Sequence, residues 1–169
     1  MIEKLEITDF ETVFSIMERS FPPEEYRPFD AQKALLADPA YRIYTAKENG
    51  RILGFAAVWE LENWLFLEHL AVEPQCRNRG IGGQLLDFLG KRRTCLEAEP
   101  PETEIAHRRI GFYERNGFFL NAYPYEQPSL GEGRRPVPLK IMTAGGPISP
   151  EEFTALKALL YTRVYGQKE

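Results

Sequence analysis

The segment Leu70-Ala-Val-Glu-Pro-Gln-Cys-Arg-Asn-Arg-Gly-Ile-Gly-Gly-Gln-Leu-Leu86 changes character twice along its length. An apolar run stops at Pro74, a loop with Arg77 and Arg79 follows, and glycines stand where an apolar helical pattern begins. The first N–H groups of a helix have no internal acceptor, and glycine lets a ligand approach the backbone closely. The segment therefore predicts a strand, a basic loop and a helix whose start binds an anion such as a pyrophosphate.

Two common nucleotide motifs do not fit this segment. A P-loop requires Gly-Lys-Ser/Thr, whereas this chain has Gly82-Gly83-Gln84. The dinucleotide fingerprint requires a third glycine at a spacing that Gly80-Ile81-Gly82-Gly83 does not provide. ATP and NAD are therefore disfavoured as ligands. A plain strand-to-helix turn is the structural alternative, but glycine inside a helix is unfavourable by about 1 kcal/mol relative to alanine.

Hydrophobic periodicity and turn residues predict the remaining elements. Helices are expected at about 8–19, 31–38, 82–91, 102–115 and 150–165. Strands are expected at about 41–47, 52–60, 64–72, 94–98, 118–123 and 137–142. Asn49-Gly50 predicts a tight hairpin turn, and Ser149-Pro-Glu-Glu152 predicts a capped helix start. The hairpins make most of the sheet antiparallel, and the strand-helix-strand unit around the glycines makes part of it parallel.

The composition is that of an ordinary single-domain protein. Of the 169 residues, 43% are hydrophobic and 27% are charged, and the formal net charge is -4. An acidic balance argues against general nucleic-acid binding, and no apolar run reaches the length of a membrane span. The N-terminus lacks a signal-peptide core, and Cys76 and Cys95 have no metal-ligand spacing. We therefore expect a cytoplasmic protein without a metal and without nucleic-acid or membrane partners.

Two motifs resemble one known family. Val72-x-Pro74-x-x-Arg77-x-x-Gly80-Ile81-Gly82 resembles the acetyl-CoA signature of the GNAT superfamily, the Gcn5-related N-acetyltransferases. The stretch from Arg108 to Phe118, with Phe112-Tyr113 and Gly117-Phe118, resembles the later helix-to-strand segment of that family. The resemblance implies an α/β GNAT fold, with a mostly antiparallel sheet, a splayed parallel strand pair and flanking helices. One domain over 1–169 is expected, with a core to about 143 and a helical extension at about 149–165.

The resemblance also implies a function, the transfer of an acetyl group from acetyl-CoA to a primary amine by direct attack in a ternary complex. The pyrophosphate would contact the backbone of Arg77, Asn78, Arg79, Gly80, Ile81, Gly82 and Gly83. The pantetheine arm would pair with the backbone of Leu70, Ala71 and Val72. An N–H near Leu70 would polarise the thioester carbonyl, and Tyr113 would give a proton or a hydrogen bond to the departing thiolate.

An attacking amine must lose a proton, so a base is expected. Glu68 lies two residues before Leu70, where the family often has a glutamate, and it is the candidate; a solvated strand position is the equally open alternative. His69 has the opposite strand parity and is expected to be a hydrogen-bonded neighbour. Ala106 stands where many family members have a coenzyme-contacting Asn, seven residues before the tyrosine, which puts that contact in doubt.

The acceptor stays open between a small-molecule amine and a protein or peptide amine. A non-catalytic acyl-CoA binding or sensing module is the alternative function. The final helix is a plausible homodimer element. The acidic residues Glu97, Glu99, Glu102 and Glu104 either attract a cationic acceptor or are solvated.

Overall fold

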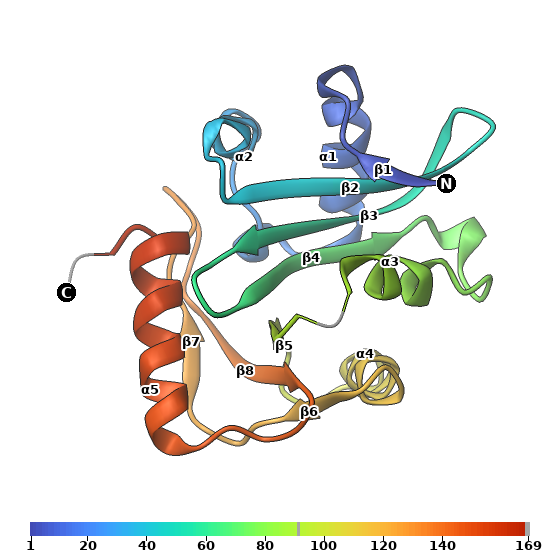
Figure 1. Cartoon of the computed structure of the whole chain (residues 1–169). Coiled ribbons are helices and arrows are strands. Elements are labelled where there is room, and N and C mark those ends of the chain that lie inside the picture. Colours follow the sequence, from blue (N-terminus) through green and yellow to red (C-terminus); the bar gives the residue numbers. More distant parts are fainter. Residues whose placement is uncertain (91, 168–169) are drawn as a thin grey trace. The chain divides into compact units, whose positions relative to one another are not determined.

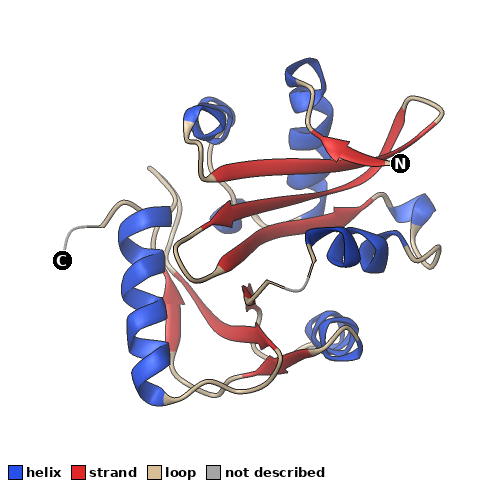
Figure 2. Ribbon diagram, viewed as in Figure 1, coloured by secondary structure: helices blue, strands red, loops and turns tan. Residues whose placement is uncertain are grey.

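The structure is a computed structural model that describes residues 1–90 and 92–167 (Figure 1). The chain divides into two compact units, Met1–Arg92 and Arg93–Glu169. Each unit is an open sheet with helices packed on it, which confirms the mixed α/β fold expected from the sequence (Figure 2). The parallel strand pair and the assignment of the whole chain to one domain stay predictions.

The sheet of the first unit is an antiparallel meander preceded by a short edge strand. β2 (Tyr41–Glu48), β3 (Arg51–Glu60) and β4 (Leu65–Val72) follow one another in sequence and in space. β1 (Ile2–Lys4), which the periodicity did not predict, pairs with β2. Asn49 and Gly50 have φ values of 52° and 76°, so the predicted hairpin turn is confirmed.

Helices cover both faces of this sheet. α1 (Phe10–Ser20) and α3 (Ile81–Leu89) both contact β3. Because β3 is buried along nearly its whole length, side chains on both of its faces must be covered. The remaining helical segments of the unit are η1 (Ile7–Asp9), η2 (Pro23–Glu25), α2 (Phe29–Ala34), η3 (Leu35–Ala37) and η4 (Pro74–Cys76).

The predicted helix boundaries were accurate to a few residues. The helix expected from residue 8 begins at Phe10, because the η1 turn precedes α1, and its N-cap Asp9 makes no side-chain cap hydrogen bond. α3 ends at Leu89 because Gly90 has a φ of 87°, which stops the helix.

In the second unit, β8 (Val137–Ala144) pairs antiparallel with every other strand. Its partners are β5 (Thr94–Ala98), β6 (Phe118–Leu120) and β7 (Tyr125–Gln127). α4 (Glu104–Arg115) contacts β5 and β6. The sequence did not predict β7, because three residues are too few for a recognisable alternation.

The chain ends in α5 (Pro150–Leu159), which continues into a π-helical turn, η5 (Leu160–Val164). The predicted capping box is confirmed: Ser149 accepts from the Glu152 N–H, and Glu152 accepts from the Ser149 N–H. Phe153 and Leu156 are buried, and the Phe153 ring lies 4.8 Å from that of Tyr123. The apolar stripe of the extension therefore packs within its own unit.

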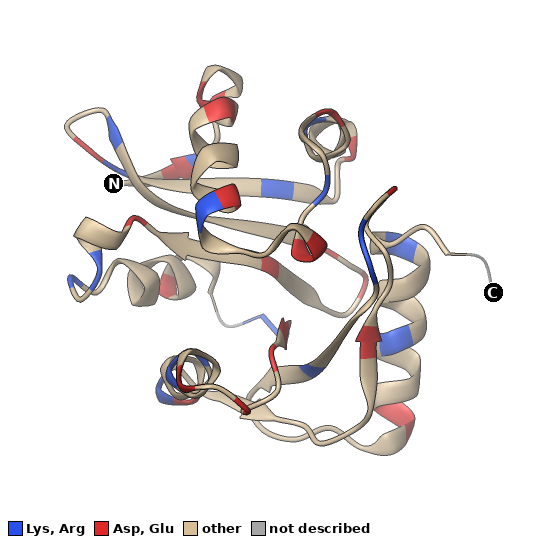
Figure 3. Ribbon diagram, turned by 180° about the vertical axis from the view of Figure 1, so that it is seen from behind, with Lys and Arg blue, Asp and Glu red and all other residues tan. Residues whose placement is uncertain are grey.

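Charged residues of both signs are distributed over each unit (Figure 3). Within the described ranges 1–90 and 92–167, no helix combines the length and the apolar character that crossing a bilayer requires.

Replacing Gly54 with Ala should destabilise the protein. A Cβ at Gly54 would lie 2.7 Å from the carbonyl oxygen of Ala71, so β3 and β4 would have to separate. We expect the G54A variant to lose about 2 kcal/mol of unfolding free energy, as overpacked cores do, in urea melts followed by circular dichroism.

Gly111→Ala is the matched control. A Cβ there would meet only the flexible end of Arg115, at 3.3 Å, and alanine favours the helix by about 1 kcal/mol. If both variants changed stability equally, the close approach of β3 and β4 would not be what requires glycine at position 54.

Candidate functional site

The start of α3 presents backbone donors without helical acceptors. Gly80, with a φ of 78°, is the N-cap residue and has no side chain to cap the helix. The first backbone bond of the helix is the 3.0 Å contact from the Gln84 N–H to the Gly80 carbonyl. The N–H groups of Ile81, Gly82 and Gly83 thus precede the hydrogen-bonded turn, and they are available to an anion.

The loop before this helix is exposed and basic. Arg77, Asn78 and Arg79 are exposed, and Asn78 has a φ of 64°. Arg79 forms a 2.7 Å ion pair with Glu48, in which the side chains are 47% and 54% exposed. A pair this open contributes little stability, so its guanidinium can turn to a phosphate at small cost. The predicted phosphate-binding residues therefore lie together in one loop and helix start.

Glu73 fixes the place where that loop leaves the sheet. Its carboxylate accepts two hydrogen bonds from Arg19 of α1, at 2.8 and 2.9 Å. Its N–H donates to the carbonyl of Leu53 at 2.8 Å. The hydrogen bonds from Arg19 hold the pKa of the Glu73 carboxyl below its ordinary value, although partial burial opposes them. The sequence did not predict this anchor, because Arg19 and Glu73 are far apart along the chain.

β4 carries a β-bulge next to the predicted base. Ala57 of β3 pairs with His69 while Val58 pairs with Leu67, so Glu68 is an extra residue in the ladder. A bulge interrupts the alternation of side chains. Glu68 and His69 accordingly both contact the segment 21–27, which corrects the expectation that their side chains have opposite parity.

The Glu68 carboxylate is buried and both of its oxygens are occupied. Oε2 accepts from the Arg27 guanidinium at 3.0 Å and Oε1 accepts from the Trp59 indole at 2.8 Å. The Glu68 and Arg27 side chains are 2% and 9% exposed, so Glu68 is not a solvated strand position. Burial alone would raise the pKa of Glu68, but Arg27, His69 and Trp59 together leave it below its ordinary value. The base role of Glu68 stays a prediction, and this setting makes its carboxylate a poor proton acceptor.

A buried glutamine supports the ion pair from α2. The Gln32 side chain accepts from the Arg27 N–H at 3.0 Å and donates to the Tyr41 hydroxyl at 2.9 Å. The Tyr41 ring lies 5.0 Å from that of Trp59. Gln32, Arg27 and Trp59 were missed by sequence reasoning, since no local pattern marks them as partners of a residue on β4.

The His69 ring is held at two places. Its Nε2 lies 2.7 Å from the carbonyl oxygen of Glu25, and the Phe21 ring lies 4.9 Å away. The residue is 2% exposed, and Nδ1 is buried without a hydrogen-bond partner in the part of the chain that the structure describes. Burial lowers the pKa of His69, against the nearby charge of Glu68, which raises it. At neutral pH the ring is therefore uncharged.

In the second unit, Tyr113 lies in the last turn of α4 between Phe112 and Phe118, at ring distances of 5.1 and 5.6 Å. Burial raises the pKa of Tyr113 to about 12, although Arg109 opposes the shift. The phenol is therefore protonated at neutral pH. Ala106 of the same helix is 1% exposed, so the position where the family often has an asparagine is here part of the core.

Two of the acidic residues at and after the end of β5 form contacts within their own unit. Glu97 accepts from the Tyr125 hydroxyl at 2.5 Å and from the Tyr165 hydroxyl at 2.7 Å. Glu99 lies 3.6 Å from the Arg109 guanidinium. These contacts favour a structural role over the alternative of attracting a cationic acceptor.

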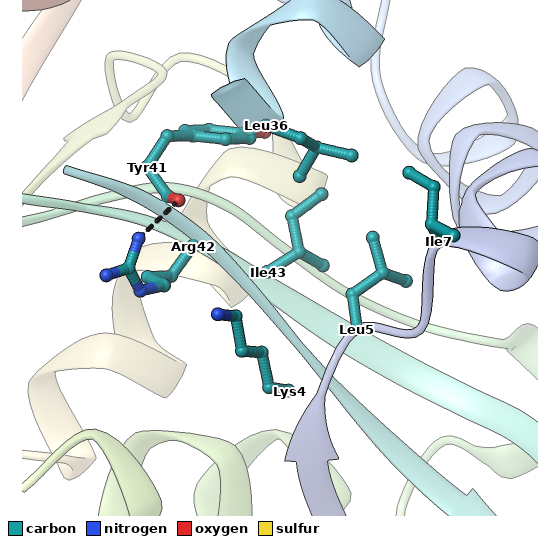
Figure 4. A pocket seen from close by; sticks show the side chains of 7 residues that line it. All are labelled: Lys4, Leu5, Ile7, Leu36, Tyr41, Arg42 and Ile43. Atoms are coloured by element: carbon teal, nitrogen blue, oxygen red, sulfur yellow. Dashed lines mark hydrogen bonds between the residues drawn. The ribbon is translucent and has the colours of Figure 1, made fainter. Parts of the chain in front are cut away.

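The first unit also has a small hollow, and none of the residues predicted to bind the coenzyme or to act as the base lines it. It has a volume of about 160 Å³ and opens beside β1 and β2 (Figure 4). Its lining residues are Lys4, Leu5, Ile7, Leu36, Tyr41, Arg42 and Ile43. Only Tyr41 belongs to the network around Glu68, through the bond from Gln32. Within residues 1–90 and 92–167, no three His, Cys, Asp or Glu side chains are grouped so that they could hold a metal ion.

Removing the cation of the buried pair should destabilise the protein strongly. We expect Arg27→Met to lower the unfolding free energy at pH 7 by about 3 kcal/mol, because the Glu68 charge is left buried without its partner. At pH 4 the loss of unfolding free energy should be smaller, since the unpaired Glu68 carboxyl of the variant can then be protonated. In the wild type, the lowered pKa means that the contribution of Glu68 is present above pH 4.5 and is lost as the pH falls through its folded pKa.

The matched control is Arg108→Met, which removes the exposed pair with Glu104 on α4. Its side chains are 74% and 81% exposed, so the expected change is below about 0.5 kcal/mol. Denaturant melts at both pH values measure the difference. Equal losses of unfolding free energy in the two variants would show that the buried Arg27–Glu68 pair contributes no more stability than the exposed pair.

Comparisons with known proteins show the family and the fold of the chain. The family described as "Acetyltransferase (GNAT) domain" matches residues 39–119. A solved structure of a GNAT-family protein from Bacteroides thetaiotaomicron is 30% identical, with 99% of each chain covered and a TM-score of 0.89. YncA from Salmonella typhimurium, solved with its cofactor acetyl-CoA, has the same fold at 18% identity, with 89% and 96% of the chains covered and a TM-score of 0.60.

One curated relative is the protein YjbC of Bacillus subtilis (strain 168), which is 30% identical over 102 residues. The match covers 58% of this chain and 52% of the relative, so the chain spans about half the length of that protein. The Bacteroides structure, by contrast, is matched over its whole length at the same identity. The chain therefore belongs to the GNAT family of acetyltransferases.

Proposed function

We propose that the protein transfers an acetyl group from acetyl-CoA to a primary amine by direct attack in a ternary complex. The observation that carries this proposal is the start of α3. Gly80 has a left-handed conformation there, and the backbone N–H groups of the next three residues have no acceptor within the helix. This feature follows a strand and a basic loop, and the free N–H groups of a helix start are suited to bind an anion. Membership of the GNAT family supplies the chemical context.

The residues present fit the coenzyme. Its pyrophosphate would be held by the N–H groups of Ile81, Gly82 and Gly83, with Arg77 and Arg79 adding positive charge. The backbone of Leu70 to Val72 would pair with the pantetheine arm in the manner of an added strand. When bound, the coenzyme supplies an acetyl thioester that an amine can attack. An N–H near Leu70 would stabilise the charge that develops on the carbonyl oxygen.

Tyr113 is suited to hold the proton that the departing thiolate needs. Because burial raises its pKa to about 12, the phenol keeps its proton at neutral pH. A thiol has a pKa of about 8.5, so the thiolate is a weaker base than this phenolate, and the phenol assists its departure by donating a hydrogen bond to sulfur. Tyr113 therefore acts as the general acid of the proposed reaction through this hydrogen bond.

A non-catalytic acyl-CoA binding or sensing module is the second candidate. The observation that favours it is the state of Glu68, whose two oxygens are already occupied in a buried ion pair. Such a module would bind acetyl-CoA without releasing free thiol in the presence of any amine. The acceptor of an active enzyme would be a small-molecule or a protein amine in the cytoplasm, and a homodimer through the final helix belongs to the same proposal.

The first test is the thermal midpoint with and without acetyl-CoA, with ATP and NAD as controls. A ligand at about 100 times its Kd adds about 2.7 kcal/mol of stability, which gives a clear rise. Gly82→Glu should abolish the rise, because a carboxylate side chain at the helix start repels phosphates. Ala155→Glu, on the exposed face of α5, should keep it. A well-folded wild type without any rise would contradict the proposal.

Tyr113→Phe should lower kcat by about 100-fold, which is the lower range for a lost general acid. The rise in thermal midpoint with acetyl-CoA should stay unchanged, since the hydroxyl acts only during the transfer. Tyr44→Phe on β2 is the control and should leave both quantities unchanged. Thiol release from acetyl-CoA measures the rate, and an unaltered kcat would remove Tyr113 from the proposed chemistry.

A further inference from the structure

The tautomer of His69 follows from its hydrogen bond. Its Nε2 lies 2.7 Å from the backbone carbonyl of Glu25, and a carbonyl oxygen can only accept. Nε2 must therefore carry the hydrogen. In the neutral ring this leaves Nδ1 as a lone-pair acceptor that points away from the Glu25 carbonyl.

No hydrogen bond uses that lone pair within residues 1–90 and 92–167. Nδ1 is one of few buried side-chain atoms there without a partner, and the residue is 2% exposed. Buried polar groups are nearly always satisfied, and an exception calls for an explanation such as a catalytic role. The ring is also fixed in orientation, because the Phe21 ring packs against it at 4.9 Å.

Glu68 cannot offer a comparable acceptor. Its Oε2 and Oε1 are bonded to Arg27 and Trp59 at 3.0 and 2.8 Å. The bulge nevertheless places its carboxylate beside His69, facing the same segment 21–27. Glu68 thus acts as a fixed negative charge next to an imidazole with an open nitrogen.

His69 also directly precedes Leu70, whose backbone N–H is the proposed donor to the thioester carbonyl. Consecutive Cα atoms are about 3.8 Å apart, so the His69 ring is attached one residue from the backbone N–H that the proposed function assigns to the thioester carbonyl. No other buried side-chain nitrogen in residues 1–90 and 92–167 is both unpartnered and on this strand.

From this geometry we propose that Nδ1 of His69 is the atom that takes the proton from the acceptor nitrogen during acetyl transfer, an inference that rests on the proposed function. The neutral amine attacks the thioester carbon, a C–N bond forms and the carbonyl electron pair moves to oxygen. The nitrogen, now positively charged, gives its proton to Nδ1. The carbonyl then re-forms, the C–S bond breaks, and the thiolate leaves with a hydrogen bond from Tyr113. The imidazolium gives its proton to water, which restores neutral His69.

The surroundings of His69 suit this step. The imidazolium that forms is stabilised by Glu68 on its own strand and is opposed by Arg27 of the covering segment. The Glu25 carbonyl keeps its bond to Nε2–H in both protonation states. Because the ring is 2% exposed, the proposal requires that the side chains covering Nδ1 move when an acceptor binds, while the bond from Nε2–H to the Glu25 carbonyl stays in place.

The test compares His69→Gln with the wild type in thiol release from acetyl-CoA. Glutamine can keep the N–H donor to Glu25 but has no nitrogen that takes up a proton. Methylamine, 1,4-diaminobutane, glycinamide and an alanine-initiated peptide are the acceptor probes, and the one with the fastest wild-type rate is used. We expect kcat to fall at least about 100-fold, with an unchanged acetyl-CoA-induced thermal shift and partial rescue by added imidazole. His107→Gln, on the exposed face of α4, is the matched control.

The pH profile separates proton transfer from a structural role. Wild-type kcat should fall as the pH drops through the pKa of His69, which lies below its ordinary 6.5. In the His69→Gln variant this fall of kcat at low pH should be absent. In Glu68→Gln the fall should occur at a lower pH, because the negative charge that favours the imidazolium is gone.

A measurement on the unmodified protein keeps the proposal falsifiable if the variant does not fold. ¹⁵N NMR of the two imidazoles, assigned with His107→Gln, should show His69 with a proton on Nε2 and none on Nδ1 at pH 7. A proton on Nδ1 would overturn the proposal. Thiol release that is equal in wild type and His69→Gln would overturn it while leaving the proposed function intact. Absence of thiol release with every probe would remove the proposed function and this inference together.

Discussion

A carboxylate removed from water must be paired with a cation or become neutral, and this constraint organises the first unit. Glu68 lies at a bulge in β4 with a side chain that is 2% exposed. It stays ionised because Arg27 is buried beside it and Trp59 donates a further hydrogen bond. Gln32 in turn holds the backbone of Arg27, so α2 and the segment before it are positioned by one polar network. Removing either charge would leave the other buried and unpaired, which makes the network strongly interdependent.

The same strand performs different tasks at successive positions. The bulge turns two consecutive side chains toward the segment 21–27. Both carboxylate oxygens of Glu68 accept hydrogen bonds, whereas His69 is bonded through Nε2 only and its Nδ1 has no partner within the described residues. Beyond them, Glu73 bonds to Arg19 and thereby fixes the origin of the loop that leads to α3. Gly54 lets β3 approach closely at this end of the strand. Glu68 and His69 thus lie on β4, and Glu73, which anchors the loop to α3, follows directly after its end.

The second unit differs from the family pattern in ways that its packing explains. Ala106 is buried on α4, so a larger polar side chain at this position would have to be buried as well. The C-terminal extension brings Tyr165 to Glu97, which Tyr125 also contacts. The extension therefore completes the packing around β5, and its buried residues face inward. Tyr113 at the end of α4 keeps a protonated phenol because its surroundings disfavour the phenolate.

The sequence by itself determined the elements whose signals are local. The Asn49-Gly50 turn, the Ser149 capping box and the glycines at the start of α3 depend on residues within a few positions of one another. It also determined the family, since both motifs lie within single strand-loop-helix or helix-strand stretches. Strands of three residues, β1 and β7, were too short to predict.

Only the tertiary structure decided the state of the acid-base residues. Arg27 is 41 positions from Glu68, and Glu25 is 44 positions from His69, so no local pattern could pair them. The alternation rule gave the wrong relation between Glu68 and His69, because it holds for a regular strand and a bulge interrupts it. Whether a carboxylate or an imidazole can accept a proton depends on burial and on the neighbours that folding brings to it. Those are properties of the packed chain, and they are absent from the order of its residues.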